Sequence, residues 1–524
     1  MRTPRLLALL PALLPALWLA GAASPAHADS VLLKDGRAIE CKKAAKAEDG
    51  RWILSFEHGE IPLPADLVKE AFTTGAGGVP EAKNPEEQAL IDKGLVPFEG
   101  KWVPRSERDS KLAKRSAEAQ KRIEEAKAHR LWRNRYKAKT SNFEFEYTIP
   151  PEIAKGYMDL LETFFAYFTK EFKVSKPKER LKVCFYHDYE TFLEVSGAPY
   201  GALAYYRFVA PFELNFFYDR LRPEETVAIM FHEAQHYLAH LMDLRFHMPH
   251  CVGEGFSEYY GGSRWDPLKK TMVTGGVQEG RLTEVQTDIQ GGERKKLEDY
   301  LLGKLDYADY TWGWTFIHFM METPKYAKKF RAFYGSLATG KDIVRKPVNG
   351  DMLTVEPDQL LKAFQKAMGV TDLAPLEKEW HEYIDTKLKL TGVTGFEEAA
   401  FAASNTGRSI RAKRLFKEAV EKGSKNPVVF LRYGELVWSE DSALTERLFR
   451  QGLEADPLNP SLYAALGRLV RNKGGDENQA AGTKLIKLAA ELDPDSAETS
   501  LLVEEALEKL APPAGPKGGG EDGK

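Results

Sequence analysis

The sequence predicts a multidomain α+β protein with a small N-terminal β module, a central α+β domain and a C-terminal α-helical repeat. Three observations support this. At 524 residues the chain is too long for one ordinary hydrophobic core, so two to four domains are expected. Strand and helix patterns alternate from about residue 139, and a repeated helical pattern follows residue 396. A hydrophobic content of 43% with 29% charged residues is ordinary for a globular protein.

Residues 1–28 have the pattern of a secretory signal peptide. Two arginines precede a long apolar run, which ends in the A-H-A cleavage pattern at residues 26–28. The alternative, a membrane anchor, is disfavoured by Pro11 and Pro15 within the run. The mature protein is therefore expected to be exported, periplasmic or extracellular, with no stable membrane span after cleavage.

Charge and cysteine content exclude two further classes. The net charge of −3, or −5 without the two signal-peptide arginines, is mild and argues against a nucleic-acid partner. Only three cysteines are present, Cys41, Cys184 and Cys251, so a disulfide framework is excluded and at most one bridge can form. Cys251 is expected to be a small buried hydrophobe rather than a ligand or nucleophile.

The N-terminal segments carry turn signals and charge but no catalytic pattern. Residues 29–72 contain short alternating runs around Asp-Gly and His-Gly turns, which predict a small β module, either a meander or a barrel. Residues 73–105 are expected to be a Gly-rich linker followed by a short hairpin. Residues 106–138 are dense in Lys, Arg, Glu and Ala and predict a solvated charged helix that acts as a spacer.

Residues 139–392 form the predicted central domain. FEFEYTI and LKVCFYH are expected to be strands, each followed by a helix, and ALAYYRF and ELNFFY are expected to be paired strands. ELNFFY is interpreted either as an ordinary core strand or as the edge strand on which an extended peptide docks.

The chemistry is concentrated in a helix predicted over residues 227–242, with Pro223 at its start. It contains His232-Glu233-Ala234-Gln235-His236, an HExxH. Side chains four residues apart lie on the same face of a helix, so both imidazoles can reach one metal ion. Glu233 can then reach a water bound to that ion.

Glu254 is the candidate third ligand, since catalytic zinc usually takes three protein ligands. It follows His236 after seventeen intervening residues, enough for the first helix to end and a second helix to begin. Glu258 lies one turn beyond Glu254 and suits a role in holding a ligand imidazole through its other nitrogen.

Other histidines near this motif are alternative candidates for metal ligands. His240 is expected to pack or hydrogen-bond, because one straight helix cannot present three successive turns to a single ion. His247 and His250 are loop residues, and either could support a ligand. A metzincin site requires a histidine at position 242, where the chain has Met242, so that class is excluded.

HEAQH followed by GEGFSEYY resembles the gluzincin clan of zinc metallopeptidases, and more narrowly the peptidase MA-like domains of secreted bacterial proteins. The resemblance implies a thermolysin-like catalytic domain with zinc held by His232, His236 and Glu254. It also implies Glu233 as general base and Glu258 as a supporting residue. Two departures are the cysteine at 251, where the family has an aromatic residue, and a slightly short spacing before Glu254.

Two later segments bear on the same site. Residues 263–306 are interpreted as an insertion that could cover the cleft as a lid. In the resembling family a tyrosine of a Y-x-x-W segment faces the cleft, which here corresponds to Tyr310. Its hydroxyl could stabilise an oxyanion, or the side chain could simply pack. Tyr307 and His318 are weaker candidates.

Residues 396–510 repeat with an offset of 33, since RLFKEAVEKGSKNP at 414–427 aligns with RLFRQGLEADPLNP at 447–460. The pattern resembles tetratricopeptide repeats, which implies a concave surface for a protein partner. A generic helical bundle is the alternative. Gly434 and Gly467 match across the repeats, where helices are expected to approach closely. Residues 511–524 are expected to be disordered by composition.

The sequence as a whole predicts a secreted zinc metallopeptidase in which Glu233 activates the attacking water and Tyr310 stabilises the oxyanion. An endopeptidase or a specialised peptidase is favoured, because the G-x-M-E-N segment of the related aminopeptidases is absent. The alternative is a catalytically inert zinc-binding scaffold of the cell envelope that binds proteins through its repeats. The intact Glu233 favours the enzyme, since a structural zinc site does not need it.

Overall fold

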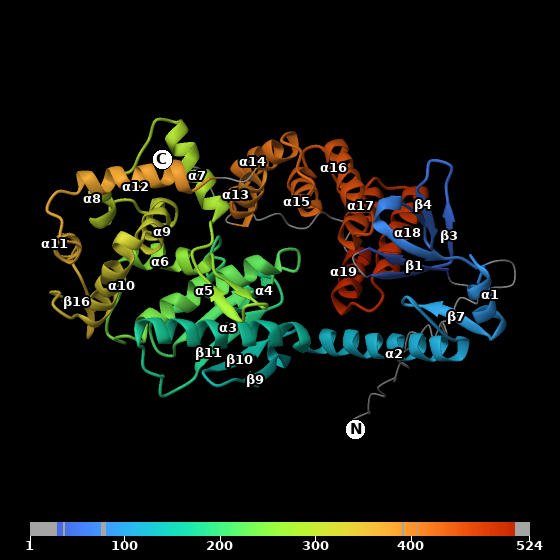
Figure 1. Cartoon of the computed structure of the whole chain (residues 1–524), viewed down its shortest axis with the longest axis horizontal. Helices are drawn as coiled ribbons and strands as arrows, with labels where there is room; N and C mark the ends of the chain where they lie inside the picture. Colours follow the sequence, from blue (N-terminus) through green and yellow to red (C-terminus); the bar gives the residue numbers. More distant parts are fainter. Residues whose placement is uncertain (1–28, 35–36, 75–79, 390–391, 406, 509–524) are drawn as a thin grey trace, which may run out of the picture. The chain divides into compact units, whose positions relative to one another are not determined.

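A computed structural model describes residues 29–34, 37–74, 80–389, 392–405 and 407–508 (Figure 1). The predicted signal peptide, residues 1–28, and the predicted disordered tail, residues 511–524, lie outside the described residues. The chain divides into two compact units, Met1–Arg115 and Ser116–Lys524. Its described part mixes helices with small sheets and ends in a helical region, which agrees with the mixed α and β class expected from the sequence.

The first unit contains two three-stranded antiparallel sheets, in the orders β2-β1-β6 and β3-β4-β5. Short helix α1 and hairpin β7–β8 follow, and the hairpin lies within the segment where the sequence predicts one. Phe98 of this hairpin is buried, as expected for a compact turn of chain. The elements are β1 (Asp29–Leu33), β2 (Ala38–Cys41), β3 (Lys43–Lys46), β4 (Trp52–Ser55), β5 (Glu60–Leu63), β6 (Val68–Phe72), α1 (Pro85–Asp92), β7 (Leu95–Phe98) and β8 (Lys101–Pro104).

The charged helix α2 (Arg105–His129) is shorter than the predicted 106–138. It ends because aromatic residues beyond it pack into the second unit. Trp132 lies 4.5 Å from the ring of Tyr186, and Tyr136 already belongs to strand β9 (Tyr136–Lys139). Tertiary packing therefore overrides the helical propensity of this Lys- and Arg-rich stretch.

A five-stranded sheet in the order β12-β13-β11-β10-β9 forms the frame of the second unit. The three middle strands are parallel, and the strand at each edge runs antiparallel to its neighbour. The first five residues of the ELNFFY segment form β13, an interior strand in which all five are buried. The interpretation as an ordinary core strand is therefore confirmed, and the interpretation as an edge strand is wrong. The edge beside it is β12. The strands are β10 (Phe143–Tyr147), β11 (Leu181–Tyr186), β12 (Ala204–Arg207) and β13 (Glu213–Phe217).

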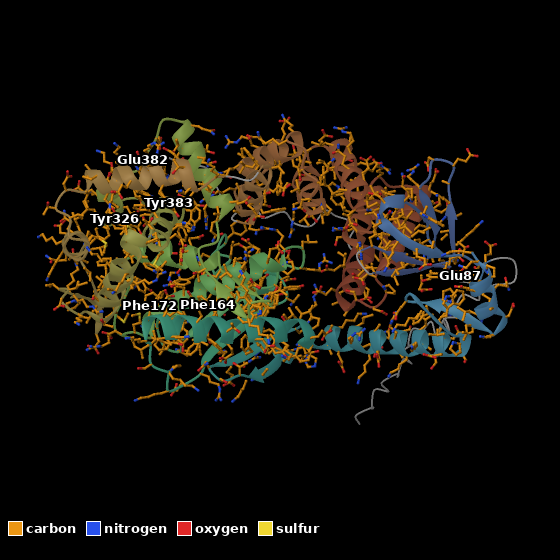
Figure 2. The ribbon with its side chains drawn as sticks, viewed as in Figure 1. Glu87, Phe164, Phe172, Tyr326, Glu382 and Tyr383 are labelled. Atoms are coloured by element: carbon orange, nitrogen blue, oxygen red, sulfur yellow. The ribbon has the colours of Figure 1, made fainter. Side chains whose placement is uncertain are left out.

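Alternate residues of these strands contact different layers of helices, as the period of two requires. One face carries Phe145, Phe185 and Phe216 in the main core with α3 (Pro151–Phe172) and α5 (Pro223–His240). Figure 2 shows the side chains on this frame, with Phe164 and Phe172 labelled along α3. The other face packs Cys184, Tyr186 and Phe217 against α4 (Tyr189–Ser196). The sheet is thus covered on both sides.

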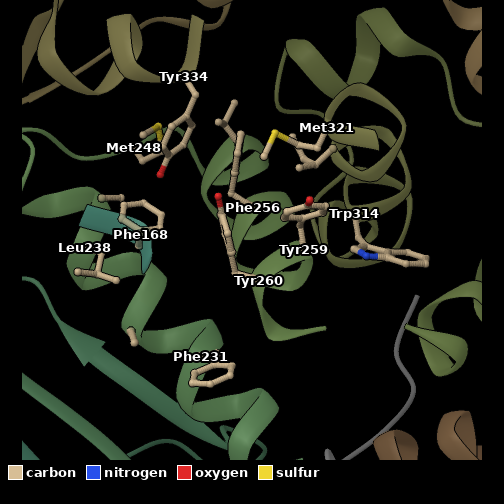
Figure 3. Close-up of a cluster of buried hydrophobic side chains, with 14 of the residues drawn as sticks. Phe168, Phe231, Leu238, Met248, Phe256, Tyr259, Tyr260, Trp314, Met321 and Tyr334 are labelled. Atoms are coloured by element: carbon tan, nitrogen blue, oxygen red, sulfur yellow. The ribbon is translucent and has the colours of Figure 1, made fainter. Parts of the chain in front are cut away.

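An aromatic-rich core joins α5 to the helices that follow it (Figure 3). Phe231 and Leu238 of α5, Tyr260 of α6, Trp314 of α9 and Tyr334 of α10 are each at most 1% exposed, so α5 is held on its inner side by several helices. The remaining elements of this region are α6 (His250–Gly261), β14 (Arg264–Asp266), β15 (Thr271–Val273), α7 (Glu279–Gln290), α8 (Leu297–Leu301), α9 (Trp314–Glu322), α10 (Pro324–Thr339), β16 (Lys346–Asn349), β17 (Met352–Thr354), α11 (Pro357–Met368) and α12 (Ala374–Lys387).

The C-terminal region consists of helices packed in sequence order. Gly434 and Gly467 lie where neighbouring helices approach closely, as the sequence predicts. A Cβ at Gly434 would lie 2.4 Å from the ring of Phe449, and one at Gly467 would lie 2.6 Å from the carbonyl oxygen of Gly482. The helices are α13 (Thr394–Asn405), α14 (Ser409–Glu421), α15 (Pro427–Val437), α16 (Ser442–Ala455), α17 (Pro460–Asn472), α18 (Asp476–Leu492) and α19 (Ala497–Glu508).

Within the described ranges, every helix is too short or too polar to cross a membrane.

Candidate metal centre

Helix α5 presents the two histidines of the HExxH motif side by side. It begins at Pro223, where a missing N–H is tolerated, and Glu224 and Glu225 place negative charge in the first turn, as expected from the sequence. His232 and His236 are one turn apart, and their ring centroids are 5.1 Å apart. The helix therefore delivers both imidazoles to one point.

Helix α6 brings Glu254 to the same point. Its Oε2 lies 3.2 Å from Nε2 of His232 and 3.5 Å from Nε2 of His236. Gly255 makes this placement possible, because a Cβ there would lie 2.7 Å from Ile317 Cγ1 and 3.2 Å from the carbonyl oxygen of Gly313. A glycine next to Glu254 thus lets α6 approach the following helices closely.

The three side chains fit a divalent metal ion. One ligand atom from each lies within 4.8 Å of the others. Ligands at about 2.0–2.2 Å from a tetrahedral zinc ion lie about 3.3–3.6 Å from one another, close to the distances from Glu254 to the two imidazoles. Glu254 Oε2 is also buried with no hydrogen-bond partner among the described residues, which leaves an acceptor for a cation. His232, His236 and Glu254 are only 14%, 12% and 13% exposed.

Charge within the cluster shifts two of its pKa values. Burial lowers the pKa of His232. Contact with Glu254 and the charges of Glu258 and Glu233 outweigh burial and raise this pKa to about 9. Burial raises the pKa of Glu254, but the two histidines outweigh burial and hold that pKa well below its usual range. Without a cation the cluster therefore keeps a proton on His232, and metal binding must displace it.

Glu233 lies beside this cluster, held by the edge strand of the sheet. Its Oε2 accepts a hydrogen bond from the backbone N–H of Tyr206 in β12, at 2.9 Å. Burial raises the pKa of Glu233, while the neighbouring His232 and His236 act in the opposite direction. A carboxylate with a raised pKa beside a candidate metal centre can accept a proton from a water molecule.

Glu258 lies next to the other nitrogen of His232, as predicted for a supporting residue. Its Oε1 is 3.5 Å from Nδ1 of His232. Two residues around α7 hold this carboxylate in turn. Arg281 donates through Nη2 to Oε1 at 2.7 Å and through Nε to Oε2 at 3.2 Å, and Gln278 donates to Oε2 at 3.2 Å.

Sequence analysis missed Arg281 and Gln278 because no motif surrounds them. They belong to the segment 263–306, which the sequence indicates could cover the cleft as a lid. In the structure its helix α7 packs between the metal centre and the C-terminal helices, where Arg411 lies 3.6 Å from Glu284. The segment therefore contributes a wall of the site through α7.

Tyr310 lies in a π-helical turn, η3 (Asp309–Gly313), facing the metal centre. Its ring is stacked on His232, with centroids 6.2 Å apart and an interplanar angle of 12°. The guanidinium of Arg281 lies 5.5 Å from the centroid of the Tyr310 ring, and burial raises the pKa of the phenol. Tyr310 thus remains protonated at neutral pH and can donate a hydrogen bond.

The other candidate histidines divide into two groups. His240 shares hydrogen bonds with Tyr206 and the carbonyl oxygen of Leu244, both at 2.8 Å, so it is a structural residue as expected. His318 likewise contacts Tyr383 and Gly275, away from the cluster.

Two further histidines lie closer to the candidate metal centre. The expectation that His250 is a loop residue is wrong, because it is the first residue of helix α6. His250 contacts Asp309 at 2.8 Å and lies 3.9 Å from Glu254 Oε1, so it belongs to the surroundings of that ligand. His247 stacks on Phe208 with centroids 5.0 Å apart. Tyr307 accepts a hydrogen bond from Arg281 at 3.1 Å. Cys251 is 2% exposed, as expected for a buried hydrophobe, and all three cysteines are free.

Comparison of the chain with protein-family models, with curated proteins and with solved structures finds no match.

Proposed function

We propose that this chain is an exported, zinc-dependent metallopeptidase of the gluzincin type, which hydrolyses peptide bonds in the periplasm or outside the cell. The observation that carries the proposal is the convergence of His232, His236 and Glu254 on one point with Glu233 beside them. A structural zinc site needs the first three residues but not the fourth. The resemblance of the HExxH and EGxxEY segments to that clan supports the same reading.

The residues divide the chemistry as follows. His232, His236 and Glu254 would hold zinc, which when bound supplies positive charge that polarises the scissile carbonyl and acidifies the attacking water. Glu233 accepts the proton of that water and later donates it to the leaving amine. The Tyr206 N–H orients the Glu233 carboxylate, and Tyr310 donates to the oxyanion.

Two variants test the assignment separately. Metal analysis of the purified protein should find one zinc per chain in the wild type and loss of zinc in His232→Ala. Glu233→Gln should retain zinc but lose cleavage of labelled casein by several orders of magnitude, because the proton acceptor is gone. Chelation should abolish cleavage by the wild type.

The same measurements separate the rival function. A wild type that binds zinc yet cleaves no substrate across a broad peptide library would favour an inert scaffold that binds proteins through its C-terminal helices. Full cleavage by Glu233→Gln would remove the proposed mechanism. Equal zinc content in the wild type and in His232→Ala would remove the metal assignment.

A further inference from the structure

A cavity of about 600 Å³ lies between the central sheet and the C-terminal helices of the second unit. Its volume is within the range of about 300–1,000 Å³ typical of pockets that bind small organic ligands. None of the metal-centre residues lines it, so it is a separate site. What it binds can be argued from its two walls.

One wall is the carboxyl edge of the sheet. The middle strands β10, β11 and β13 are parallel, so their carboxyl ends meet at one edge. The residues that directly follow them, Thr148, His187 and Tyr218, all line the cavity. In open sheets with parallel strands, ligands bind in the crevice outside this edge.

The opposite wall consists of alternate C-terminal helices, α13, α15, α17 and α19. Ion pairs tie this wall to its surroundings. Arg432 of α15 lies 3.5 Å from Asp219, which follows β13, and Arg130 at the end of α2 lies 3.3 Å from Glu505 of α19. The inner face of these helices is therefore turned toward the sheet, and a ligand must be small enough to enter the chamber between them.

Arg220 is a cation of this lining with no carboxylate within ion-pair distance among the described residues. Arg130 and Arg432 are each in ion pairs, whereas no described residue forms a hydrogen bond or ion pair with Arg220, which also lines the cavity. Burial lowers the pKa of Arg220, and the negative charge of Glu498 acts in the opposite direction. A guanidinium withdrawn from water in this way favours a carboxylate ligand.

The rest of the lining restricts the kind of carboxylate. Six acidic side chains also face the cavity: Asp188, Glu190, Asp219, Glu435, Glu498 and Glu505. They would repel a polyanion such as a nucleotide. Apolar side chains from both walls, among them Phe217, Leu431 and Leu501, offer contacts to hydrophobic groups. A ligand with one carboxylate, apolar side chains and neutral amides fits this combination.

We propose that the cavity binds a short apolar peptide through its free C-terminal carboxylate, with Arg220 as the residue that pairs with that carboxylate. The peptide's side chains pack against Phe217 and Leu431. This site is independent of the metal centre, and the proposal does not rest on the proposed peptidase activity.

The test is calorimetric titration of trileucine and trileucine amide into the full chain carrying Glu233→Gln, which prevents hydrolysis. Trileucine should bind, and amidation of its carboxylate should weaken binding about 10- to 100-fold, because a charge-assisted pair is lost. Adding Arg220→Gln should weaken trileucine binding by a similar factor and make the acid and the amide equivalent. Arg220→Lys should recover part of the preference.

Arg264→Gln serves as the matched control, since Arg264 is exposed on strand β14 and does not line the cavity. It should leave both affinities unchanged. The comparison of acid with amide in the parent chain needs no change at Arg220, so a folding defect in that variant leaves the proposal testable. Absence of trileucine binding at millimolar concentration, equal affinity for acid and amide, or undiminished binding in Arg220→Gln would each overturn it.

Discussion

The guanidinium of Arg281 binds the carboxylate of Glu258 at both oxygens, at 2.7 and 3.2 Å. Glu258 is the residue whose Oε1 lies 3.5 Å from the second nitrogen of His232. A residue of α7 thus orients the imidazole of His232, a ligand of the proposed metal centre, through one intermediate carboxylate. Residues that hydrogen-bond to the second nitrogen of a metal-binding histidine fix the orientation of its ring and tune its basicity.

Arg281→Gln is therefore expected to weaken zinc binding about 10- to 100-fold, because Glu258 loses its bidentate partner. Competition against a chromophoric chelator measures this directly, whether or not the protein cleaves peptides. Arg281→Lys keeps the charge but cannot bond both oxygens of Glu258 in the same geometry. Its zinc affinity should therefore lie between those of the wild type and Arg281→Gln. Arg294→Gln is the control, since the exposed Asp385 is the only described residue to which Arg294 bonds. Unchanged affinity in Arg281→Gln would show that Glu258 holds His232 without help.

Two helical glycines should respond oppositely to alanine. At Gly255 an added Cβ would meet Ile317 Cγ1 at 2.7 Å and the Gly313 carbonyl oxygen at 3.2 Å, so Gly255→Ala is expected to lower the free energy of unfolding by about 1–3 kcal/mol. At Gly156 in α3 no atom lies within 4 Å of an added Cβ. Gly156→Ala should therefore raise the free energy of unfolding by about 0.5–1 kcal/mol, through helix propensity.

Chemical denaturation of both variants beside the wild type measures these differences. Zinc affinity should fall with stability in Gly255→Ala, because the clash moves the helix that carries Glu254. Equal stability of the two variants would mean that α6 does not approach α9 as closely as the structure places it.

Local spacing predicted the parts of the site that lie on one helix or on adjacent helices. The start of α5 at Pro223, the shared face of His232 and His236, and the placement of Glu254 each follow from helix periodicity and a short connection. The close contact at Gly467 was likewise visible from its repetition. Such features depend on neighbours in the sequence.

Features set by long-range pairing could not be predicted in this way. Whether β13 is an edge strand depends on β12, which pairs beside it, and no residue of ELNFFY encodes that order. Arg281 reaches Glu258 only because an intervening hairpin returns the chain to the site. The end of α2 at His129 is set by packing of Trp132 on Tyr186.

Glu146 in β10 should make stability depend on acid pH. Burial raises the pKa of Glu146, but hydrogen bonds from Arg135 and Lys137 and the charge of Lys182 outweigh burial and lower it to about 2. A carboxylate whose folded pKa lies below its unfolded value stabilises the fold above the unfolded value, near 4.5. This stabilisation is lost as the pH falls from there through about 2.

Glu146→Gln is accordingly expected to be about 1–2 kcal/mol less stable than the wild type at neutral pH, a figure reduced for the exposure of Lys137. The difference should be mostly lost at about pH 2, where half of the wild-type carboxyl groups are protonated, and should vanish below that pH. Urea unfolding across this range gives the comparison. Glu144→Gln on the same strand, whose partner Lys139 is exposed, should change stability by less than about 0.5 kcal/mol at any pH. A constant difference between Glu146→Gln and wild type would contradict the assigned pKa.

Tyr310 can be tested by removing its hydroxyl alone. The ring of Tyr310 stacks on His232, so Tyr310→Phe preserves the contact that supports the ligand and deletes only the proton donor. If the hydroxyl stabilises the oxyanion, kcat for a peptide substrate should fall about 10²- to 10³-fold while zinc affinity and KM stay near the wild-type values. Tyr310→Ala removes the stacking as well and should also weaken zinc binding. A Phe variant with wild-type kcat would assign Tyr310 to packing. The donor would then be another group, such as His250, whose Nε2 lies 3.9 Å from Glu254 Oε1.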